Sequence, residues 1–337
     1  MCGIVGILDY GSGKHLVSES AIKMMTNEIR HRGPDDDGIF ISHDQTIGLG
    51  FRRLSIIDLS TAGHQPMGTA DSKIWIVFNG EVYNHLEIRK DLELKGYKYK
   101  SKTDTETILY AYQEYGIEFI SKLYGMFAIA IWDSRKEQLF LIRDRIGIKP
   151  LYYTSRNGAF FFASEIKAIL TQPEISRDVN PQGLYDYLTF LTTPPNETLF
   201  RNIFKLEAGH YISIDRSGNV IKKQYWDLNE QSSHYGDNDF NNENFCIDNI
   251  RRLLRDSIKL RMMSDVPFGV MLSGGIDSSL NVALMSELMN RPVETFTVGY
   301  KDLEKYNELK YARQIAQQFE TNHHELLLDE GNLLDIL

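Results

Sequence analysis

A cysteine stands at position 2, directly after the initiator methionine. A small side chain at this position favours removal of that methionine, which would leave the cysteine as the first residue. An N-terminal cysteine carries its own general base, because its α-amino group has a pKa near neutrality and lies close to the sulfur. Cys2 could therefore attack an amide carbonyl as a thiolate. The ordinary alternative is an inert side chain, since a free cysteine usually behaves as a small hydrophobe.

A cysteine that cleaves amides also needs donors for the oxyanion that forms and a clamp for the rest of the substrate. Asn79 and Gly80 follow an apolar run and could offer an amide side chain and a closely approaching backbone N–H. Arg53 could hold a carboxylate in a bidentate pair, while Glu81 and Asp104 could hold an ammonium. One arginine with two carboxylates suits a free α-amino acid such as glutamine. Plain alternatives exist, such as a turn at Asn-Gly and a helix cap at Asp104.

A second group of small and polar residues, SGGIDSS at 273–279, follows the apolar run PFGVML and opens a helical pattern. Two glycines and several hydroxyls make a turn whose backbone N–H groups can hold a phosphate at a helix N-terminus. Asp277 could help to hold a Mg²⁺ ion that also binds the phosphates. The pattern is not the common GxxxxGK[ST] loop, and its plain alternative is a helix cap. The candidate phosphate-site residues are Ser273, Gly274, Gly275, Asp277, Ser278 and Ser279.

Short runs rich in Ile, Val, Phe, Tyr and Trp dominate the N-terminal part of the chain and predict β-strands. The predicted strands are 4–8, 38–43, 46–51, 74–79, 127–133, 139–144 and 159–164. Apolar residues that recur three and four apart predict helices over 18–30 and 104–122. Strand-rich layers with helices grouped between them indicate an α+β layered domain.

The segment 229–244 is polar, rich in asparagine and nearly free of apolar residues, so it is predicted to be a linker. After it, helical patterns alternate with strand patterns, which predicts a parallel α/β sheet. The expected elements are helices at 245–263, 278–290 and 307–319 and strands at 267–272, 293–300 and from 323 onward. The predicted domains are therefore residues 2–228 and residues 245–337, joined by the linker.

The composition is that of an ordinary packed protein, with 42% hydrophobic and 25% charged residues among 337. The formal net charge of −9 argues against nucleic acid as a partner, because such binding needs a basic surface. The two cysteines, Cys2 and Cys246, fit a reducing compartment better than a disulfide scaffold. The N-terminus lacks the layout of a secretory signal, and no apolar run of about 18 residues exists. A cytoplasmic protein without a membrane partner is expected.

The stretches around the first group of candidate residues resemble a known family. MCGIVGI, RHRGPDDDG, RRLSIIDLS, GHQPM, FNGEVYNH, SKTDTETIL, GMFAIAIWD, RDRIGIKPLYY, FASEIKAI and KLEAGHYI, in this order, are similar to the class II glutaminase domain of asparagine synthetase over residues 2–226. The resemblance implies a four-layer αββα sandwich of the N-terminal-nucleophile hydrolase type, with Cys2 as nucleophile and Asn79 and Gly80 as oxyanion hole. The glutamine-binding residues that it implies are Arg53, Leu54, Ser55, Ile56, Ile57, Asn79, Gly80, Glu81 and Asp104.

The stretch MSDVPFGVMLSGGIDSS resembles the pyrophosphate loop of the same family, whose members split ATP into AMP and pyrophosphate. Leu272 and Val298 fall where that family contacts the nucleotide, and Gly299 lies nearby. The resemblance thus implies ATP and Mg²⁺ as cofactors and an α/β parallel-sheet ATP-pyrophosphatase domain. The family's second pyrophosphate motif and the catalytic lysine beyond it do not occur in this sequence, which predicts an incomplete domain in a C-terminally truncated chain.

Three functions stay open on the sequence alone. In the first, asparagine synthesis, ammonia from glutamine displaces AMP from β-aspartyl-AMP, and the partners are the small molecules glutamine, aspartate and ATP. In the second, the same machinery amidates another carboxylate, on a sugar or a peptide. In the third, a truncated chain either keeps only glutaminase activity or binds a longer partner without catalysis. A homodimer is one possible assembly.

Overall fold

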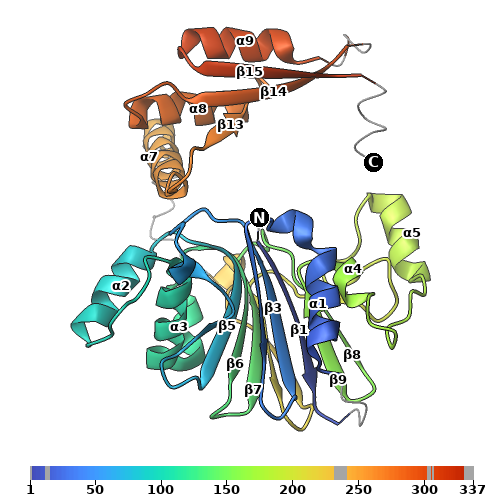
Figure 1. The fold of residues 1–337 in the computed structure, drawn as a ribbon. Coiled ribbons are helices and arrows are strands. Elements are labelled where there is room, and N and C mark those ends of the chain that lie inside the picture. The colour runs from blue at the N-terminus through green and yellow to red at the C-terminus, as the bar shows by residue number, and fades with distance from the viewer. Residues whose placement is uncertain (1, 12–15, 231–240, 302–304, 306, 330–337) are drawn as a thin grey trace. The chain divides into compact units, whose positions relative to one another are not determined.

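The computed structural model of the protein describes residues 2–11, 16–230, 241–301, 305 and 307–329. The chain divides into two compact units, Met1–Ser232 and Ser233–Leu337. Figure 1 shows antiparallel sheets with helices in the first unit and a smaller parallel sheet with helices in the second. The linker predicted at 229–244 falls mainly on 231–240, which lie outside the described residues, so its bounds stay a prediction.

The first sheet of the N-terminal unit has six strands in the order β10-β8-β9-β1-β3-β2. Its strands are Gly3–Asp9 (β1), Asp36–Ile41 (β2), Ile47–Arg53 (β3), Tyr152–Arg156 (β8), Ala159–Ala163 (β9) and Phe204–Lys205 (β10). The central strand β1 pairs antiparallel with β3, with Gly3 opposite Arg52. This register places Cys2 beside the end of β3, where Arg53 lies.

The second sheet has the order β12-β11-β7-β6-β5-β4. Its strands are Met67–Gly68 (β4), Ile74–Val82 (β5), Gly125–Asp133 (β6), Gln138–Arg143 (β7), His210–Asp215 (β11) and Val220–Gln224 (β12). The sequence predicted that β5 would end at Asn79. It continues to Val82, because Asn79 and Gly80 pair with Ala128 and Phe127 of β6. The alternative of an Asn-Gly turn is therefore wrong.

The first unit also contains α-helices and short 3-10 turns. The helices are Glu19–Glu28 (α1), His85–Leu94 (α2), Asp104–Tyr115 (α3), Ile166–Ile169 (α4) and Pro181–Phe190 (α5), with 3-10 turns Arg30–Arg32 (η1), Thr61–Gly63 (η2), Gly116–Lys122 (η3) and Leu228–Glu230 (η4). The helix predicted over 104–122 is α-helical only to Tyr115, since Gly116 has φ +61° and the chain continues as η3. Helix α2 was not predicted, because only three of its ten residues are buried.

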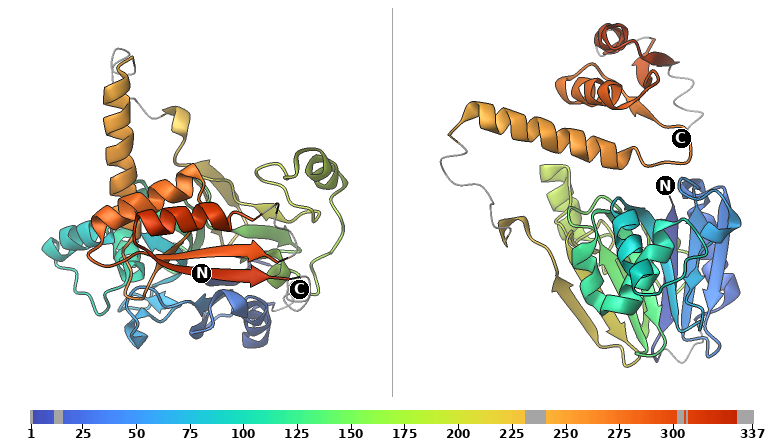
Figure 2. Two further views of the ribbon diagram at one scale, coloured as in Figure 1. Left: turned by 90° about the horizontal axis from the view of Figure 1, so that it is seen from above. Right: turned by 90° about the vertical axis from the view of Figure 1, so that its left-hand side faces the viewer.

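Three separate apolar cores define four layers. One core packs α1 and α4 against the first sheet, with Ile22 and Met25 meeting Val5 and Phe161. A second fills the space between the sheets. The third packs α2 and α3 against the second sheet. The views in Figures 1 and 2 agree with this order of helix, sheet, sheet, helix, and the predicted αββα sandwich is confirmed.

The second unit alternates helices with strands, as its sequence predicted. Its elements are Glu243–Arg261 (α7), Gly269–Met271 (β13), Ile276–Leu288 (α8), Glu294–Tyr300 (β14), Leu309–Gln318 (α9) and Asn322–Leu328 (β15). The strands form a parallel sheet in the order β13-β14-β15. A small buried cluster of Leu272, Val282, Ala312 and Ala316 joins α8 and α9 to this sheet, so the turn after β13 has a fixed place.

Candidate active site

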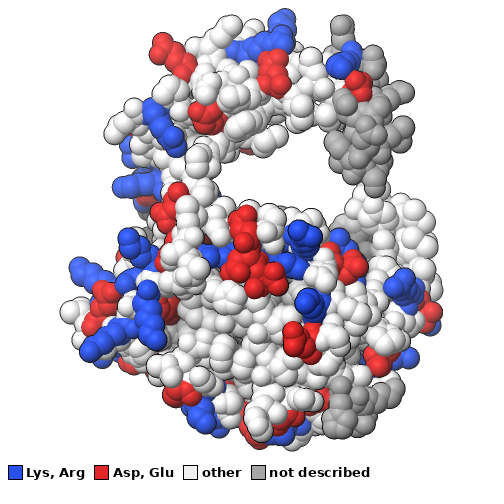
Figure 3. All heavy atoms as spheres, in the orientation of Figure 1, with Lys and Arg blue, Asp and Glu red and all other residues white. Residues whose placement is uncertain are grey.

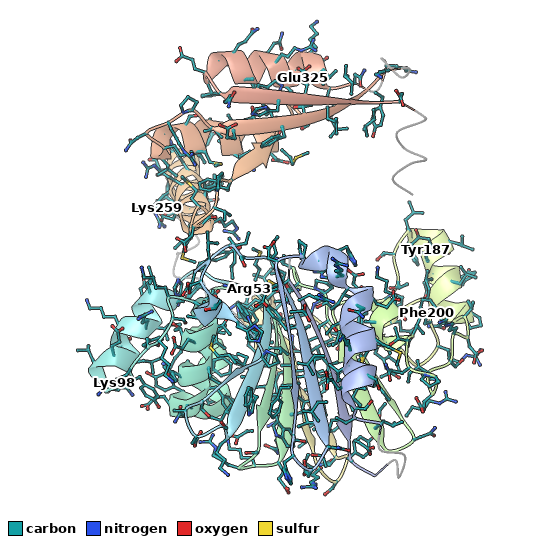
Figure 4. The ribbon with its side chains drawn as sticks, in the orientation of Figure 1. Arg53, Lys98, Tyr187, Phe200, Lys259 and Glu325 are labelled. Carbon is teal, nitrogen blue, oxygen red and sulfur yellow. The ribbon has the colours of Figure 1, made fainter. Side chains whose placement is uncertain are left out.

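The ends of β1, β3 and β5 and the start of α3 enclose a cavity of about 200 Å³. Figure 4 labels Arg53 at this end of the sandwich. The cavity is lined by Cys2, Phe51, Arg53, Leu54, Ile56, Ile57, Gly63, Gln65, Phe78, Asn79, Gly80, Glu81, Thr103, Asp104, Thr105, Met126 and Lys149. Every residue that the sequence predicted for the glutamine site is in this set except Ser55.

The thiol of Cys2 lies against the backbone that follows β3. Its Sγ is 3.5 Å from the Leu54 carbonyl oxygen and 3.4 Å from the Leu54 nitrogen. Arg32 Nε donates to the Cys2 carbonyl oxygen over 2.9 Å, and Arg32 also pairs with Glu165 at 2.9 Å, which fixes the backbone that carries the thiol. Burial raises the pKa of Cys2, while the Leu54 N–H and the positive chain terminus act to lower it. The thiol thus needs nearby positive charge to ionise.

Asn79 offers the cavity a buried amide donor. Its side chain is 1% exposed, and its Nδ2 has no hydrogen-bond partner among the described residues. A buried donor without an acceptor is costly, and native structures rarely keep one unless something else satisfies it. The negatively charged oxygen of a tetrahedral intermediate would be such an acceptor.

The backbone N–H of Gly80 faces the open edge of β5. On that edge the Phe78 N–H donates to Gln65 Oε1 over 2.7 Å, and the Val82 N–H donates to Asp104 Oδ2 over 2.9 Å. Backbone N–H groups alternate in direction along a strand, so the N–H of Gly80, midway between them, points to the same edge. A Cβ at position 80 would lie 2.2 Å from the Met126 carbonyl oxygen, so only glycine fits there.

Two carboxylates, the buried Asp104 and the partly buried Glu81, line the same cavity. Asp104 is 5% exposed and accepts the Val82 N–H, while the helix cap of α3 is Thr103, whose side chain accepts from Glu106. The alternative of Asp104 as helix cap is therefore wrong. Burial raises the pKa of Asp104 to about 7, and the neighbouring Glu81 carboxylate adds to this shift. Burial also raises the pKa of Glu81. A substrate ammonium would let both groups ionise.

We expect the stability of the parent chain, relative to Asp104→Asn, to fall as the pH rises from about 4 to about 7. The folded-state pKa of Asp104 lies above its ordinary value of 3.8, so the folded chain binds the extra proton in this window. Each pH unit there costs at most on the order of 1.4 kcal/mol of unfolding free energy, and the loss is complete above pH 7. Urea unfolding of both chains across the window measures it. A stability difference between the two chains that does not vary with pH would contradict the raised pKa of Asp104.

The guanidinium of Arg53 is fixed by the chain that follows it. It donates to the carbonyl oxygens of Ile57 at 3.4 Å, Asp58 at 2.5 Å and Ser60 at 2.9 Å. Arginine has five N–H donors, so two are left for a ligand carboxylate. Ser55 lies in the same segment, but its N–H donates to Asp35 Oδ2 over 2.8 Å, outside the cavity lining.

Gly63→Ala is expected to raise the KM for glutamine by about tenfold with a much smaller change in kcat. A Cβ at position 63 would lie 2.1 Å from Arg53 Nη2, so the guanidinium must shift away from its ligand position. A loss of about 1.4 kcal/mol in a charge-assisted pair corresponds to this factor. Steady-state glutamate release measures both constants. Gly50→Ala is the control for general disruption. A Cβ at position 50 would clash with Thr26 and Val5 in the core and would not meet Arg53.

Several lining residues were missed by the sequence analysis. Gln65 spans the cavity wall, donating to Thr105 Oγ1 over 3.1 Å and accepting from the Phe78 N–H. Lys149 lies 6% exposed in the wall near Glu81 and Cys2. Both stand in stretches that carried the family resemblance, GHQPM and RDRIGIKPLYY. No spacing rule links them to Cys2, and only the pairing of distant strands brings them to it.

The SGGIDSS residues of the second unit form the turn between β13 and α8. The N–H of Ser273 donates to the Ser278 hydroxyl over 3.3 Å, and the N–H of Gly275 donates to the Ser273 hydroxyl over 3.3 Å. Gly275 is the N-cap of α8 and provides no side-chain cap, so the first N–H groups of this helix remain for a ligand. Gly274 has φ +81°, and a Cβ there would lie 2.5 Å from the Tyr311 backbone.

The other predicted nucleotide contacts lie at the carboxyl ends of two adjacent strands. The Leu272 N–H donates to the Phe296 carbonyl over 2.8 Å, and Met271 pairs with Phe296, so Val298 and Gly299 lie beside the turn. Ligands of parallel α/β sheets bind at this edge. Asp277 is exposed in the first turn of α8, beside Ser279. If the turn binds phosphates, one carboxylate beside it would fit a Mg²⁺ ion shared with them, and the described residues hold no cluster of three metal-binding side chains.

Lysine and arginine side chains are interspersed with aspartate and glutamate over the face that Figure 3 shows. Among the described helices, none combines the length and hydrophobicity that a membrane crossing needs.

Comparisons with known proteins match both units. The family model for the glutamine amidotransferase domain matches residues 1–226, and the model for asparagine synthase matches residues 249–337. The chain is 39% identical to asparagine synthetase [glutamine-hydrolyzing] 1 of Bacillus subtilis, over 94% of this chain and 48% of that protein. It is 37% identical to putative asparagine synthetase [glutamine-hydrolyzing] 2 of Methanocaldococcus jannaschii, over 100% of this chain and 67% of that protein.

A third relative carries a different name. Amidase chry2 of Gibberella zeae is 31% identical over 99% of this chain and 52% of its own length. The chain spans about half the length of several curated relatives that it matches. With two family models that together cover most of its residues and relatives of this identity, the chain belongs to the family of glutamine-hydrolysing asparagine synthetases.

Proposed function

We propose that the first unit hydrolyses glutamine and that the ammonia serves an ATP-dependent synthesis of asparagine from aspartate. The observation that supports the first half best is that Cys2 lines one cavity together with Gly80 and with Asn79, whose buried amide donor has no partner among the described residues. The second half rests on the membership in the family and on the phosphate-binding turn at 273–279.

In the proposed hydrolysis, glutamine lies with its carboxylate on Arg53 and its ammonium on Glu81 and Asp104. The Cys2 α-amino group takes the thiol proton, and the sulfur attacks the side-chain carboxamide carbon. The oxyanion accepts from Asn79 Nδ2 and the Gly80 N–H. The C–N bond then breaks, ammonia leaves with the proton, and water hydrolyses the thioester to glutamate. Leu54, Ile56 and Ile57 are proposed to line the glutamine site, and Ser55 is proposed to hold this segment from outside the lining.

In the proposed synthesis, the turn of Ser273, Gly274, Gly275, Ser278 and Ser279 holds the ATP phosphates. Leu272, Val298 and Gly299 contact the nucleotide, and Asp277 helps to hold Mg²⁺, which neutralises phosphate charge. The aspartate β-carboxylate forms β-aspartyl-AMP with release of pyrophosphate. Ammonia then displaces AMP and gives asparagine.

Two assays test the halves separately. Glutamate released from glutamine by the chain reports the first unit, and pyrophosphate released from ATP in the presence of aspartate and ammonia reports the second. Glutamate release without pyrophosphate release would reject the synthetase half for this chain and leave a glutaminase. Release of neither would favour a chain that binds a partner without catalysis.

A second acceptor class is supported by the relatives named amidases. The glutaminase site would be unchanged, and a sugar or peptide carboxylate would replace aspartate. A screen of carboxylates for pyrophosphate release separates the two proposals, because aspartate alone should be active under the first. A homodimer is one assembly open to this chain, and sedimentation equilibrium measures it.

A further inference from the structure

Lys149 is a buried cation in the cavity that the proposed hydrolysis does not use. It is 6% exposed and lines the cavity together with Cys2 and Glu81. Among the described residues, no carboxylate lies within 4 Å of its ammonium in an ion pair. Burying an ammonium without a close partner is costly, and burial lowers the pKa of Lys149. A buried charge of this kind in a cleft is a candidate functional group.

The loop that carries Lys149 is held at its backbone on both sides. Asp144 is completely buried, and its carboxylate accepts the N–H groups of Ile148 and Lys149, each over 2.9 Å, and that of Phe127 over 3.1 Å. Arg143 Nε donates to the Lys149 carbonyl oxygen over 2.8 Å. The Cα of Lys149 is thereby fixed to β6 and β7, so the ammonium has a defined reach into the cavity.

Charges from four elements face this ammonium. Glu81 on β5 and Cys2 at the start of β1 attract it, Arg32 of η1 opposes it, and Asp144 of its own loop adds a weaker attraction. At the Cys2 sulfur, Asp104 disfavours the thiolate, whereas the chain terminus and Arg53 favour it. Arg53 is held by backbone carbonyls. Lys149 has two anionic neighbours, Glu81 and the Cys2 thiolate, and the positive chain terminus acts on the same two groups.

We propose that Lys149 is a positioning residue for the nucleophile, its ammonium shared between Glu81 and the Cys2 thiolate. Under the proposed function, on which this step rests, the substrate ammonium binds to Glu81. The Lys149 ammonium then interacts with the Cys2 sulfur alone. Lys149 stays protonated throughout, and the thiol proton still goes to the α-amino group. Substrate binding is thereby coupled to activation of the nucleophile.

The test is the pH dependence of Cys2 alkylation by iodoacetamide, measured from the mass of the N-terminal peptide. In Lys149→Met the midpoint of the rate profile should rise by about one pH unit, which makes alkylation at pH 7 about tenfold slower. Lys149→Arg keeps the charge and should restore the parent midpoint. Lys205→Met removes a partly buried lysine of β10 outside the cavity and should leave the profile unchanged.

A double-mutant cycle with Glu81→Gln tests the sharing itself. In the parent, Glu81→Gln should move the midpoint down, because Lys149 loses its competing anion. In the Lys149→Met background the same substitution should have little effect if Glu81 acts through the lysine. An equal shift in both backgrounds would overturn the sharing.

The readout does not depend on turnover. A chain without glutamine hydrolysis but with a Lys149-dependent midpoint would reject the proposed function and keep the electrostatic role of Lys149. Glutamine hydrolysis with an unchanged midpoint in Lys149→Met would reject the role of Lys149 alone. Because methionine removes a buried charge, the variant should unfold at or above the parent temperature. If Lys149→Met does not fold, the alkylation midpoint of Lys149→Gln replaces it, and the shift of the midpoint in Glu81→Gln tests the role of Lys149 in the parent.

Discussion

Replacing Cys2 by alanine should reduce glutamate release from glutamine by a factor on the order of 10⁴ or more. The sulfur is the only nucleophile that the proposed hydrolysis uses, and a covalent mechanism loses its main route when the nucleophile is removed. Binding of glutamine should change little, because the carboxylate and ammonium contacts come from Arg53, Glu81 and Asp104. Turnover measured with a coupled glutamate assay, together with glutamine binding by calorimetry, checks both statements.

The control is Cys246→Ala, which removes the other cysteine, in α7 of the second unit. Its glutamate release should match that of the parent. The same experiment includes the mass of the N-terminal peptide, which should show that Met1 has been removed. A chain that keeps Met1 and still hydrolyses glutamine would contradict the α-amino group as the base. Full activity in Cys2→Ala would contradict the site as a whole.

Asn79→Ala should lower kcat for glutamine hydrolysis by about 10²–10³ with a small change in KM. Removal of one oxyanion donor costs about 2.7–4 kcal/mol in enzymes where it has been tested. The donor here is buried and meets no acceptor among the described residues, so its interaction is expected to be realised only when the oxyanion forms. Steady-state kinetics of glutamate release separates the two constants.

Two further variants make this prediction specific. Asn79→Asp keeps the shape but places a carboxylate against the developing oxyanion, so its kcat should fall further than that of Asn79→Ala. Thr26→Val removes a buried hydroxyl of α1 that bonds only the Lys23 carbonyl, and its kcat should stay near the parent value. A rise in KM with unchanged kcat in Asn79→Ala would show that Asn79 binds the ground state instead.

Local patterns predicted most of the elements because their signals are local. Runs such as IWIVF and FAIAIW are β-branched and aromatic, and both became central strands of the second sheet. The alternation of helix and strand after residue 245 likewise predicted the parallel sheet. Helix α2 was not predicted, since its apolar face is narrow. The end of α3 was predicted too late in the sequence, since the α-helix stops at Gly116, which has a positive φ.

The sequence by itself determined which chemistry is present: a cysteine at position 2, an Asn-Gly pair, one arginine with two carboxylates, and a glycine-serine turn before a helix. The tertiary structure decided how these groups meet. Pairing of β5 with β6 turns the Gly80 N–H toward the cavity, and burial raises the pKa of Asp104. It also placed Ser55 outside the cavity lining and Lys149 within it. Contacts between residues as far apart in sequence as Cys2 and Lys149 follow from the packing of whole sheets, which local spacing does not encode.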